Sequence, residues 1–384
     1  MPNRLSANET GIPGAAAAMP APVVLLPQGG DPAGHRLRTT AALAERIARL
    51  RGSLFLGIHE APIPGARYYA VPTATLIGGE EAALFGIESE FDLFGGLVPY
   101  TVQAGKAITH GLVGRQAHAP AGYSPGFASA VRHVVLDGFS AFDLRSAHAA
   151  GRRLIEAGPV RLKPAWADGG LQQDAVADVD ALDAALDRLD QERLDRCGLV
   201  LEQDLTENVV YSIGRVRIGD TVLSYYGFQS ATIDNSGRAA YGGSTLTVMP
   251  GELDRLLALP LDEDTHAAVR CALAYDNAAL LHFPGLIASR RNYDVICGQD
   301  AAGMRKTGVL EQSWRIGGAS GAEIAAFEAL AEDPTLASVR AACVEVYGDR
   351  PEPPADGFVY FTGDDPEVGP LTKYARIEAR HRAL

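Results

Sequence analysis

The sequence predicts an α+β protein of several lobes, and three observations support this prediction. Strands and a helix alternate at the start of the chain, and a meander of strands mixed with helices follows. A chain of 384 residues is too long for one ordinary core, so we expect two or three lobes. With 47% hydrophobic and 21% charged residues, the composition is that of a globular protein.

The composition also excludes several classes of protein. A net charge of −13 argues against a nucleic-acid-binding protein, which needs a basic surface. No uninterrupted apolar run approaches ~20 residues, so we expect no membrane span. Residues 1–21 lack a basic start followed by an apolar block, which predicts a disordered tail and not a signal peptide. The scattered cysteines indicate free thiols in a reducing cytoplasm: Cys197, Cys271, Cys297 and Cys343.

The first lobe should begin with a β-α-β unit. Val23–Leu26 is predicted as a buried strand, a helix from about Thr40 stops at Gly52, and residues 54–58 form the next strand. The intervening loop, residues 29–34, could bind a phosphate at the helix start. It lacks the G-x-G-x-x-G spacing, so an ordinary turn is the alternative.

Further along the chain, the pattern predicts a longer series of elements. Apolar residues from Val179 to Leu189 lie on one face of a helix that Gly198 ends. The expected strands follow at residues 199–202, 209–218, 221–229, 292–297, 308–313, 358–361 and 371–377. The expected helices cover residues 262–282, 322–330 and 336–347.

Lysine is rare here, with four lysines among 34 basic residues. A compact ammonium on a flexible stem suits contact with single phosphate oxygens. Lys106 and Lys163 both lie in segments typical of nucleotide-binding elements, and Lys163 ends a predicted strand. The loop that follows contains Gly169 and Gly170 and leads into another short strand, so it could form a flap over a triphosphate. The alternatives are chance retention of a lysine and a plain glycine hairpin.

Two carboxylates fall on neighbouring predicted strands. Antiparallel pairing can bring Asp294 and Glu311 side by side, with Ser313 on the same face as Glu311. Paired carboxylates with hard oxygen neighbours suit Mg²⁺ that also binds phosphates. Surface or salt-bridged residues are the alternative, but the apolar flanks of both strands favour burial.

Taken together, the order of these elements resembles the ATP-grasp superfamily, and more narrowly a branch of it without an assigned reaction. The matching pieces are Lys106, Lys163 with its glycine flap, the strand at residues 199–205, Arg291 with Asp294, and Glu311-Gln312-Ser313 followed by Arg315. The likeness covers roughly residues 106–320. It implies an α+β ATP-grasp fold in which two α+β subdomains grip ATP, preceded by a small α/β pre-ATP-grasp lobe. The implied division is residues 22–105 for the N-terminal lobe, 106–200 and 201–330 for the subdomains, and 331–384 for a C-terminal extension.

The resemblance also implies roles for individual residues, with ATP and Mg²⁺ bound. It gives Lys106, Lys163, Gly169 and Gly170 to the phosphates, Arg291 to the transferred phosphoryl group, and Asp294, Glu311 and Ser313 to magnesium. It gives Glu202, Gln203 and Leu205 to the adenine edge and Glu207 to the ribose.

The chain departs from the family pattern in two places. Two residues after Glu311, where the family usually has Asn, this chain has Ser313. The Arg291-x-x-Asp294 spacing is one residue longer than the commonest form. Phosphate contacts from the middle strands would have to come from Arg215, Arg217 or Gln229, because no lysine lies between Lys163 and Lys306.

The resemblance implies an ATP-dependent ligase that converts a small carboxylate into an acyl phosphate for attack by an amine or a thiol. Arg315 and the glycine run at residues 317–318 are candidates for binding the carboxylate, while a plain loop with Ser320 as helix N-cap is the alternative. The rival functions are another ATP-dependent phosphotransferase and a non-catalytic ATP-binding regulator. We expect a cytoplasmic protein with small-molecule partners, and a homodimer remains open.

Overall fold

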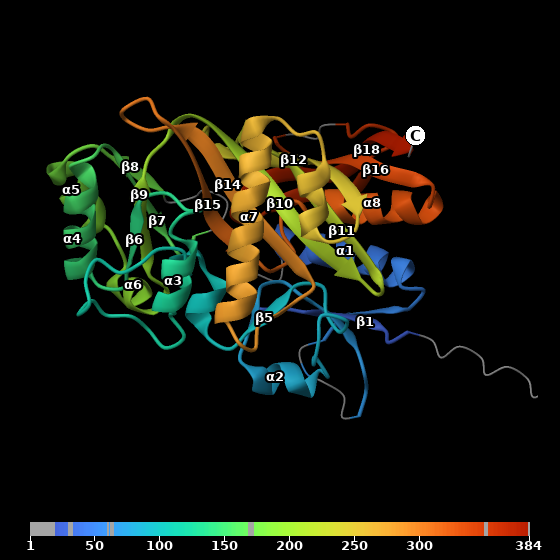
Figure 1. The fold of residues 1–384 in the computed structure, drawn as a ribbon. Helices are drawn as coiled ribbons and strands as arrows, with labels where there is room; N and C mark the ends of the chain where they lie inside the picture. Colours follow the sequence, from blue (N-terminus) through green and yellow to red (C-terminus); the bar gives the residue numbers. More distant parts are fainter. Residues whose placement is uncertain are drawn as a thin grey trace, which may run out of the picture.

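The computed structural model describes residues 20–29, 34–59, 61, 65–167, 173–348 and 352–382. Residues 1–19 of the expected tail and the predicted flap glycines, Gly169 and Gly170, lie outside the described residues. Helices and largely antiparallel sheets mix along the chain, as Figure 1 shows, so the predicted α+β class is confirmed.

The N-terminal lobe contains a parallel sheet with strand order β2-β1-β3, on which helix α1 packs. Helix α1 begins at His35, earlier than expected, because a distant residue caps it. The backbone N–H of His35 donates to Oδ2 of Asp365 at 2.6 Å. A carboxylate at a helix N-terminus is favourable, and this one comes from the C-terminal end of the chain. The lobe comprises β1 (Val23–Leu26), α1 (His35–Leu50), β2 (Phe55–Ile58), β3 (Tyr69–Pro72), β4 (Leu76–Ile77), α2 (Gly79–Leu84) and β5 (Gly96–Val98).

A second lobe carries an antiparallel sheet with strand order β6-β9-β7-β8. The single helix expected before Gly198 is wrong: two short helices stand there, since Asp190 starts a new one by accepting a hydrogen bond from the Arg193 N–H at 3.1 Å. The lobe and the segment before it comprise η1 (Thr101–Ala104), η2 (Lys106–Ile108), α3 (Pro125–Val131), β6 (Gly138–Ala141), α4 (Leu144–Ile155), β7 (Val160–Pro164), β8 (Asp174–Val176), α5 (Val179–Leu186), α6 (Gln191–Cys197) and β9 (Leu199–Gln203).

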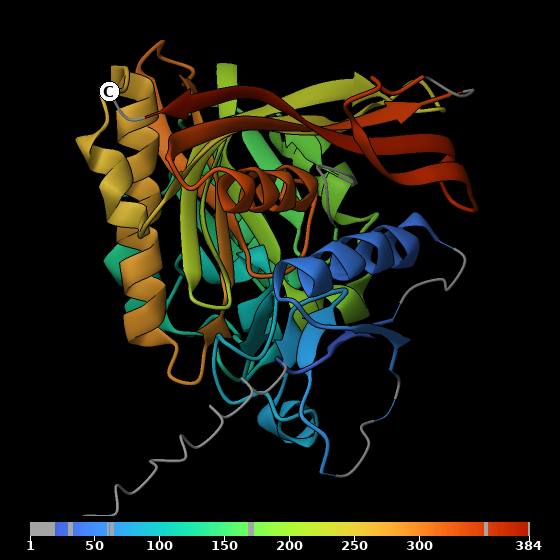
Figure 2. The ribbon, with the colours of Figure 1, turned by 90° about the vertical axis from the view of Figure 1, so that its right-hand side faces the viewer.

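The largest sheet has the strand order β15-β14-β10-β11-β12-β16-β18-β17. Helix α7 covers one face at β10, β14 and β15, and helix α8 covers the other at β12, β16 and β18 (Figures 1 and 2). The elements are β10 (Thr206–Ile218), β11 (Thr221–Ile233), β12 (Ala239–Pro250), η3 (Leu253–Ala258), α7 (Glu263–His282), β13 (Ile287–Ala288), β14 (Arg290–Gln299), β15 (Arg305–Ser313), α8 (Ser320–Glu332), β16 (Leu336–Tyr347), β17 (Phe358–Asp365) and β18 (Gly369–Arg382).

The helix predicted at residues 336–347 is wrong, because this segment is strand β16. Val339, Ala341 and Cys343 are buried on the side of the sheet that faces α8, and they alternate with less buried neighbours. Strand β16 pairs with both β12 and β18. Apolar residues at this density fit a helix or a strand, and the open edge of β12 decides in favour of the strand. The C-terminal extension expected from residue 331 therefore completes the sheet that β10 begins.

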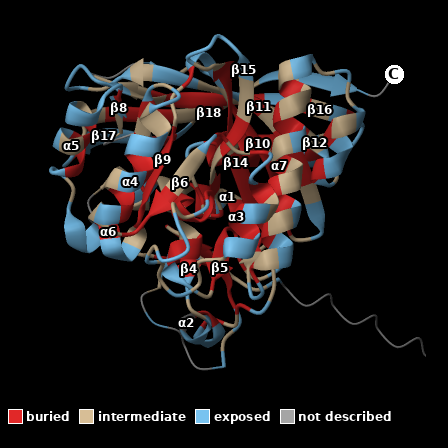
Figure 3. Ribbon diagram, turned by 60° about the vertical axis from the view of Figure 1, so that its left-hand side comes forward, coloured by how far each residue is buried: buried red, intermediate tan, exposed pale blue. Residues whose placement is uncertain are grey.

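The main core lies between the large sheet and helices α1 and α8, where the strands are buried along their central portions (Figure 3). Leu246 on β12 is fully buried in this core, whereas its neighbour Thr247 points to the other face and is partly exposed.

We expect Leu246→Ala to lower the free energy of unfolding by about 2–5 kcal/mol, because it removes buried methyl groups and leaves a cavity. Chemical denaturation compared with wild type measures the loss. Thr247→Ala is the matched control and should lose far less. Equal losses in the two variants would mean that β12 does not present Leu246 to the core.

Candidate functional site

The predicted pair of carboxylates forms on adjacent strands of the large sheet. Antiparallel pairing of β14 with β15 places Asp294 directly opposite Glu311, and Asn292 directly opposite Ser313. Opposite residues of an antiparallel pair share one face of the sheet. Asp294, Glu311, Asn292 and Ser313 therefore all point toward the side that α8 covers further along the sheet.

The carboxylate of Asp294 is held in an unfavourable environment. Burial, followed by repulsion from Glu311, raises the pKa of Asp294 from 3.8 to about 6. Hydrogen bonds from Gln229 and Asn292 oppose this rise only in part. The amide Nδ2 of Asn292 donates to Oδ1 of Asp294 at 2.9 Å. A cation beside both carboxylates would remove the repulsion.

The two lysines that the sequence singled out lie at the junction of the second lobe and the large sheet. Lys106 Nζ is 2.6 Å from Oε2 of Glu311 and donates to the carbonyl of Ala167 at 3.0 Å. Lys163 Nζ donates to Oε1 of Glu202 at 2.9 Å and to the Leu310 carbonyl of β15 at 3.3 Å. Both lysines are buried. The structure therefore brings the lysines and the Asp294–Glu311 pair to one location.

His110 completes this group and was missed in the sequence, where it showed no partner. Its Nε2 lies 2.9 Å from Oε2 of Glu202, and both side chains are buried. Burial alone would raise the pKa of Glu202, but the charge of Lys163 and the bond to His110 lower it to about 2. Gly138 leaves room for this arrangement, since a Cβ there would lie 2.8 Å from the His110 ring. That glycine, opposite Glu202 in the sheet, was the available sequence signal.

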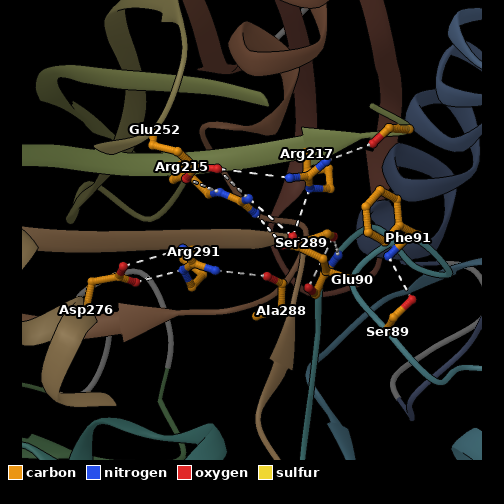
Figure 4. Close-up of polar contacts among 12 residues, drawn as sticks. Ser89, Glu90, Phe91, Arg215, Arg217, Glu252, Asp276, Ala288, Ser289 and Arg291 are labelled. Atoms are coloured by element: carbon orange, nitrogen blue, oxygen red, sulfur yellow. Dashed lines mark hydrogen bonds and ion pairs between the residues drawn. The ribbon is translucent and has the colours of Figure 1, made fainter. Parts of the chain in front are cut away.

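The structure contradicts the role predicted for Arg291. Successive residues of a strand point to opposite faces, so Arg291 and Asp294, three residues apart, cannot share one. Arg291 Nε donates to Oδ1 of Asp276 on α7 at 2.7 Å (Figure 4). Arg290 stands on the Asp294 face instead, and its Nε donates to Oε2 of Glu323 at 2.8 Å.

The predicted phosphate contacts of Arg215 and Arg217 are also wrong, because both lie on the α7 side. Arg215 bonds to Glu252 and Glu90, and the Arg217 guanidinium lies 4.7 Å from the ring centroid of Phe91 (Figure 4). These contacts join the N-terminal lobe to β10. Gln229, by contrast, lies on the Asp294 face and donates to Oγ of Ser212 at 3.2 Å.

The four residues predicted to hold the nucleoside lie in different surroundings. Glu202 faces the lysines, whereas the side chain of Gln203 points to the opposite face by strand alternation. Leu205 packs in a small apolar cluster with Leu136 and Ile296. Glu207 accepts a hydrogen bond from Gln299 Nε2 at 2.8 Å, in an exposed position. Within the described residues, Glu202 is the one of these four whose side chain is seen to bond to a lysine, Lys163.

In the segment between β15 and α8, the alternative that Ser320 is the helix N-cap is wrong, while carboxylate binding by Arg315 stays a prediction. Ser313 Oγ lies 3.4 Å from Nη1 of Arg290, so a positive charge already neighbours this predicted magnesium ligand. Arg315 Nη1 donates to the carbonyl of Ile316 at 3.1 Å. Ser320 is not the N-cap but the first residue of α8, and its Oγ accepts a hydrogen bond from the Gly317 N–H at 3.0 Å.

These donors suit a metal ion that shares its coordination with a ligand. In the described ranges, no group of three or more His, Cys, Asp or Glu side chains could hold a metal by itself. Asp294 and Glu311 supply two hard anionic oxygens, which is what Mg²⁺ takes when phosphates and water complete its shell. The same described residues include no helix that is long and apolar enough to span a membrane.

The fold and the site thus define an α+β protein with a partly buried group of carboxylates and lysines between its lobes. The chain belongs to the family described as "Protein of unknown function (DUF3182)", whose model matches residues 23–375. No curated protein sequence matches the chain.

Several solved structures are similar to it at low identity. An N5-carboxyaminoimidazole synthase from Aspergillus clavatus, solved with ADP and 5-aminoimidazole ribonucleotide, is 13% identical over 94% of this chain and 94% of that chain, with a TM-score of 0.48. A D-alanyl-alanine synthetase A from Vibrio cholerae is 11% identical over 78% and 90%, with a TM-score of 0.48. A biotin carboxylase from Campylobacter jejuni is 11% identical over 96% and 89%, with a TM-score of 0.45. Because these TM-scores lie below 0.5, we draw no activity from them.

We expect Asp294→Asn to stabilise the protein at neutral pH. Above pH 3.8 the unfolded chain releases the Asp294 proton, whereas the folded protein keeps it until about pH 6. Stability therefore falls as the pH rises through this interval. Asparagine cannot ionise, so the variant should exceed wild type by on the order of 1–3 kcal/mol at pH 7.5 and match it near pH 4, by denaturant titration.

Asp234→Asn is the control of opposite sign. Hydrogen bonds from Ser236 and Arg238 lower the pKa of Asp234 to about 2, so its contribution to stability is present above the unfolded pKa and is lost as the pH falls toward 2. This variant should be less stable than wild type at pH 7.5. A loss of stability in both variants at that pH would show that Asp294 is not strained.

Proposed function

We propose that the chain is an ATP-dependent ligase of the ATP-grasp type, which activates a small carboxylate as an acyl phosphate for attack by an amine or a thiol. One observation carries the proposal: the Asp294–Glu311 pair on the large sheet meets Lys106 and Lys163 from the second lobe. Lysines balance phosphate charge, and paired carboxylates hold magnesium against phosphates. Few ligands other than a metal-bound nucleotide need both groups in one place.

Each lysine would exchange a protein partner for a phosphate oxygen. Lys106 now neutralises Glu311, and Lys163 neutralises Glu202. If Asp294 and Glu311 held Mg²⁺, Lys106 could turn from Glu311 toward the phosphates. Lys163 could turn likewise, because the hydrogen bond between His110 and Glu202 would remain. Asp294 and Glu311 would hold the magnesium, which would supply positive charge against the phosphates.

In this proposal the lysines, and not an arginine, neutralise the charge of the transferred phosphoryl group. Arg291 is committed to Asp276 on the far face, and Arg290 is committed to Glu323. The backbone of residues 203–205 is our candidate for the adenine edge, next to Glu202. Arg315 and the backbone at residues 317–318, which precede α8, are our candidates for the acceptor carboxylate. The chemistry of the first step is mainly positioning and charge balance.

A non-catalytic ATP-binding regulator is the second candidate, and one observation favours it. Ser313 replaces the usual Asn and already neighbours the Arg290 guanidinium, which disfavours a second cation there. A regulator would bind magnesium and nucleotide without turnover. Another phosphotransferase on the same fold would instead form ADP together with a stable phosphorylated product. Under the ligase proposal, the partners are a small carboxylate and a small nucleophile in the cytoplasm.

We expect Glu311→Gln to remove most magnesium-dependent nucleotide binding and turnover, because a neutral amide binds the metal poorly. The measurements are calorimetry with ATP and Mg²⁺, and ADP release with pooled carboxylates and amines. Glu345→Gln is the matched control, since Glu345 also pairs with a buried lysine, Lys373, at 2.9 Å in the same sheet. It should bind and turn over as wild type does.

Two outcomes decide between the candidates. If wild type binds ATP with Mg²⁺ and Glu311→Gln binds it equally well, the metal site lies elsewhere and the ligase proposal fails. If wild type binds both but releases no ADP with any acceptor, the regulator is the better description. Lys106→Met should weaken ATP binding by about 1.5–3 kcal/mol in either case, the size of a charged hydrogen bond.

A further inference from the structure

A buried ion pair lies next to the candidate site, and the proposed function does not yet use it. Arg290 on β14 and Glu323 on α8 are almost fully buried, and three guanidinium–carboxylate contacts of 2.8–3.0 Å join them. Nη1 of Arg290 also donates to the carbonyls of Ser313, at 3.2 Å, and Arg315, at 2.6 Å. The pair thus fixes the start of α8 and the segment from Ser313 to Arg315 against β14.

A chain of hydrogen bonds leads from this ion pair to Asp294. The Tyr225 hydroxyl lies 2.6 Å from Oε1 of Glu323 and 3.0 Å from Oδ1 of Asn292, and these two oxygens share its single proton. Nδ2 of Asn292 then donates to Oδ1 of Asp294. A carboxylate only accepts, so the amide of Asn292 has one orientation in this chain, with its oxygen toward Tyr225.

The geometry of this chain of hydrogen bonds connects two parts of the candidate site. Glycine at position 214 is required, because a Cβ there would lie 2.3 Å from the Tyr225 hydroxyl. Tyr225 is therefore held over Gly214 in one place, between Asn292 and Glu323. Water cannot substitute for a lost partner without entering a fully buried space, because Tyr225 and Glu323 are both 0% exposed.

We propose that Asn292, Tyr225, Glu323 and Arg290 form a positioning chain that holds Asp294 in the orientation that binds a divalent cation. This inference rests on the proposed metal–nucleotide site. The chain acts through Asp294, so its members are positioning residues and do not themselves contact the metal. It also ties Asp294 to the Ser313–Arg315 segment, so the metal site and the proposed acceptor segment keep one relative arrangement.

The opposite face of the same strand supplies a matched control. The Tyr293 hydroxyl donates to Oδ1 of Asp276 at 2.5 Å, and Arg291 bonds to the same carboxylate. This second tyrosine–carboxylate–arginine group is also buried but faces α7, away from Asp294. Tyr225→Phe and Tyr293→Phe therefore each remove one buried hydroxyl bonded to a carboxylate, and only the first lies on the Asp294 face.

The test uses Mn²⁺ with ADP as the probe and electron paramagnetic resonance as the readout. Tyr225→Phe should weaken Mn²⁺ binding in the presence of ADP by about 5- to 10-fold, which corresponds to the net value of one hydrogen bond. Tyr293→Phe should match wild type within about 2-fold. Both should bind ADP alone as wild type does, which separates a positioning effect from a general loss of structure. Asn292→Ala, which leaves the Tyr225–Glu323 bond in place, should weaken Mn²⁺ binding at least as much as Tyr225→Phe.

The inference and the proposed function fail in different ways. If wild type binds Mn²⁺ with ADP, but Tyr225→Phe and Asn292→Ala bind it as tightly as Tyr293→Phe does, the positioning chain is overturned and the metal site remains. If wild type binds no Mn²⁺ even with ADP, the proposed function itself is overturned. Should Tyr225→Phe not fold, Asn292→Ala alone decides the inference by the same comparison.

Discussion

The burial of Asp294 directly beside Glu311 is the constraint on which the candidate site depends. Folding brings two like charges together on neighbouring strands in a partly buried position, and the raised pKa of Asp294 reflects the resulting cost. Lys106 offsets the charge of Glu311, and the amide of Asn292 partly offsets that of Asp294. Natural proteins keep such strained arrangements chiefly where a ligand relieves them, and a divalent cation is the ligand that matches two carboxylates.

Strand alternation explains how the same sheet carries both this site and the structure around it. Consecutive arginines on β14 point to opposite faces, and each one meets a buried carboxylate from a different helix: Glu323 of α8 for Arg290, and Asp276 of α7 for Arg291. Each carboxylate also accepts a tyrosine hydroxyl. Breaking either group would leave a charge buried and unpaired, which is strongly destabilising. Helix docking on the two faces is therefore polar as well as apolar, and only the α8 side reaches Asp294.

The sequence sufficed wherever a feature depended on local pattern or on pairing between adjacent strands. The long helix α7, the strands β10, β11, β14 and β15, and the position of Asp294 opposite Glu311 follow from periodicity and turn residues. It failed wherever a distant partner decided the outcome: Asp365 caps α1, and the edge of β12 makes residues 336–347 a strand. The error at Arg291 was different. Strand alternation alone places Arg291 and Asp294 on opposite faces of β14, but the family pattern implied that they act together.

Charge balance links the lobes to the candidate chemistry. Lys106 pairs with Glu311 and Lys163 with Glu202, so both lysines are neutralised by carboxylates and Asp294 carries the charge that no lysine is seen to balance in the described residues. Under the proposed function, a nucleotide with its metal would bind by exchanging partners, with Asp294 and Glu311 holding the cation and the lysines contacting the phosphates. Because Lys163 comes from β7 and also touches the Leu310 carbonyl of β15, that exchange acts across the junction of two sheets. Under the proposed function, occupancy of the site would therefore change a contact between the two lobes, because Lys163 takes part in both.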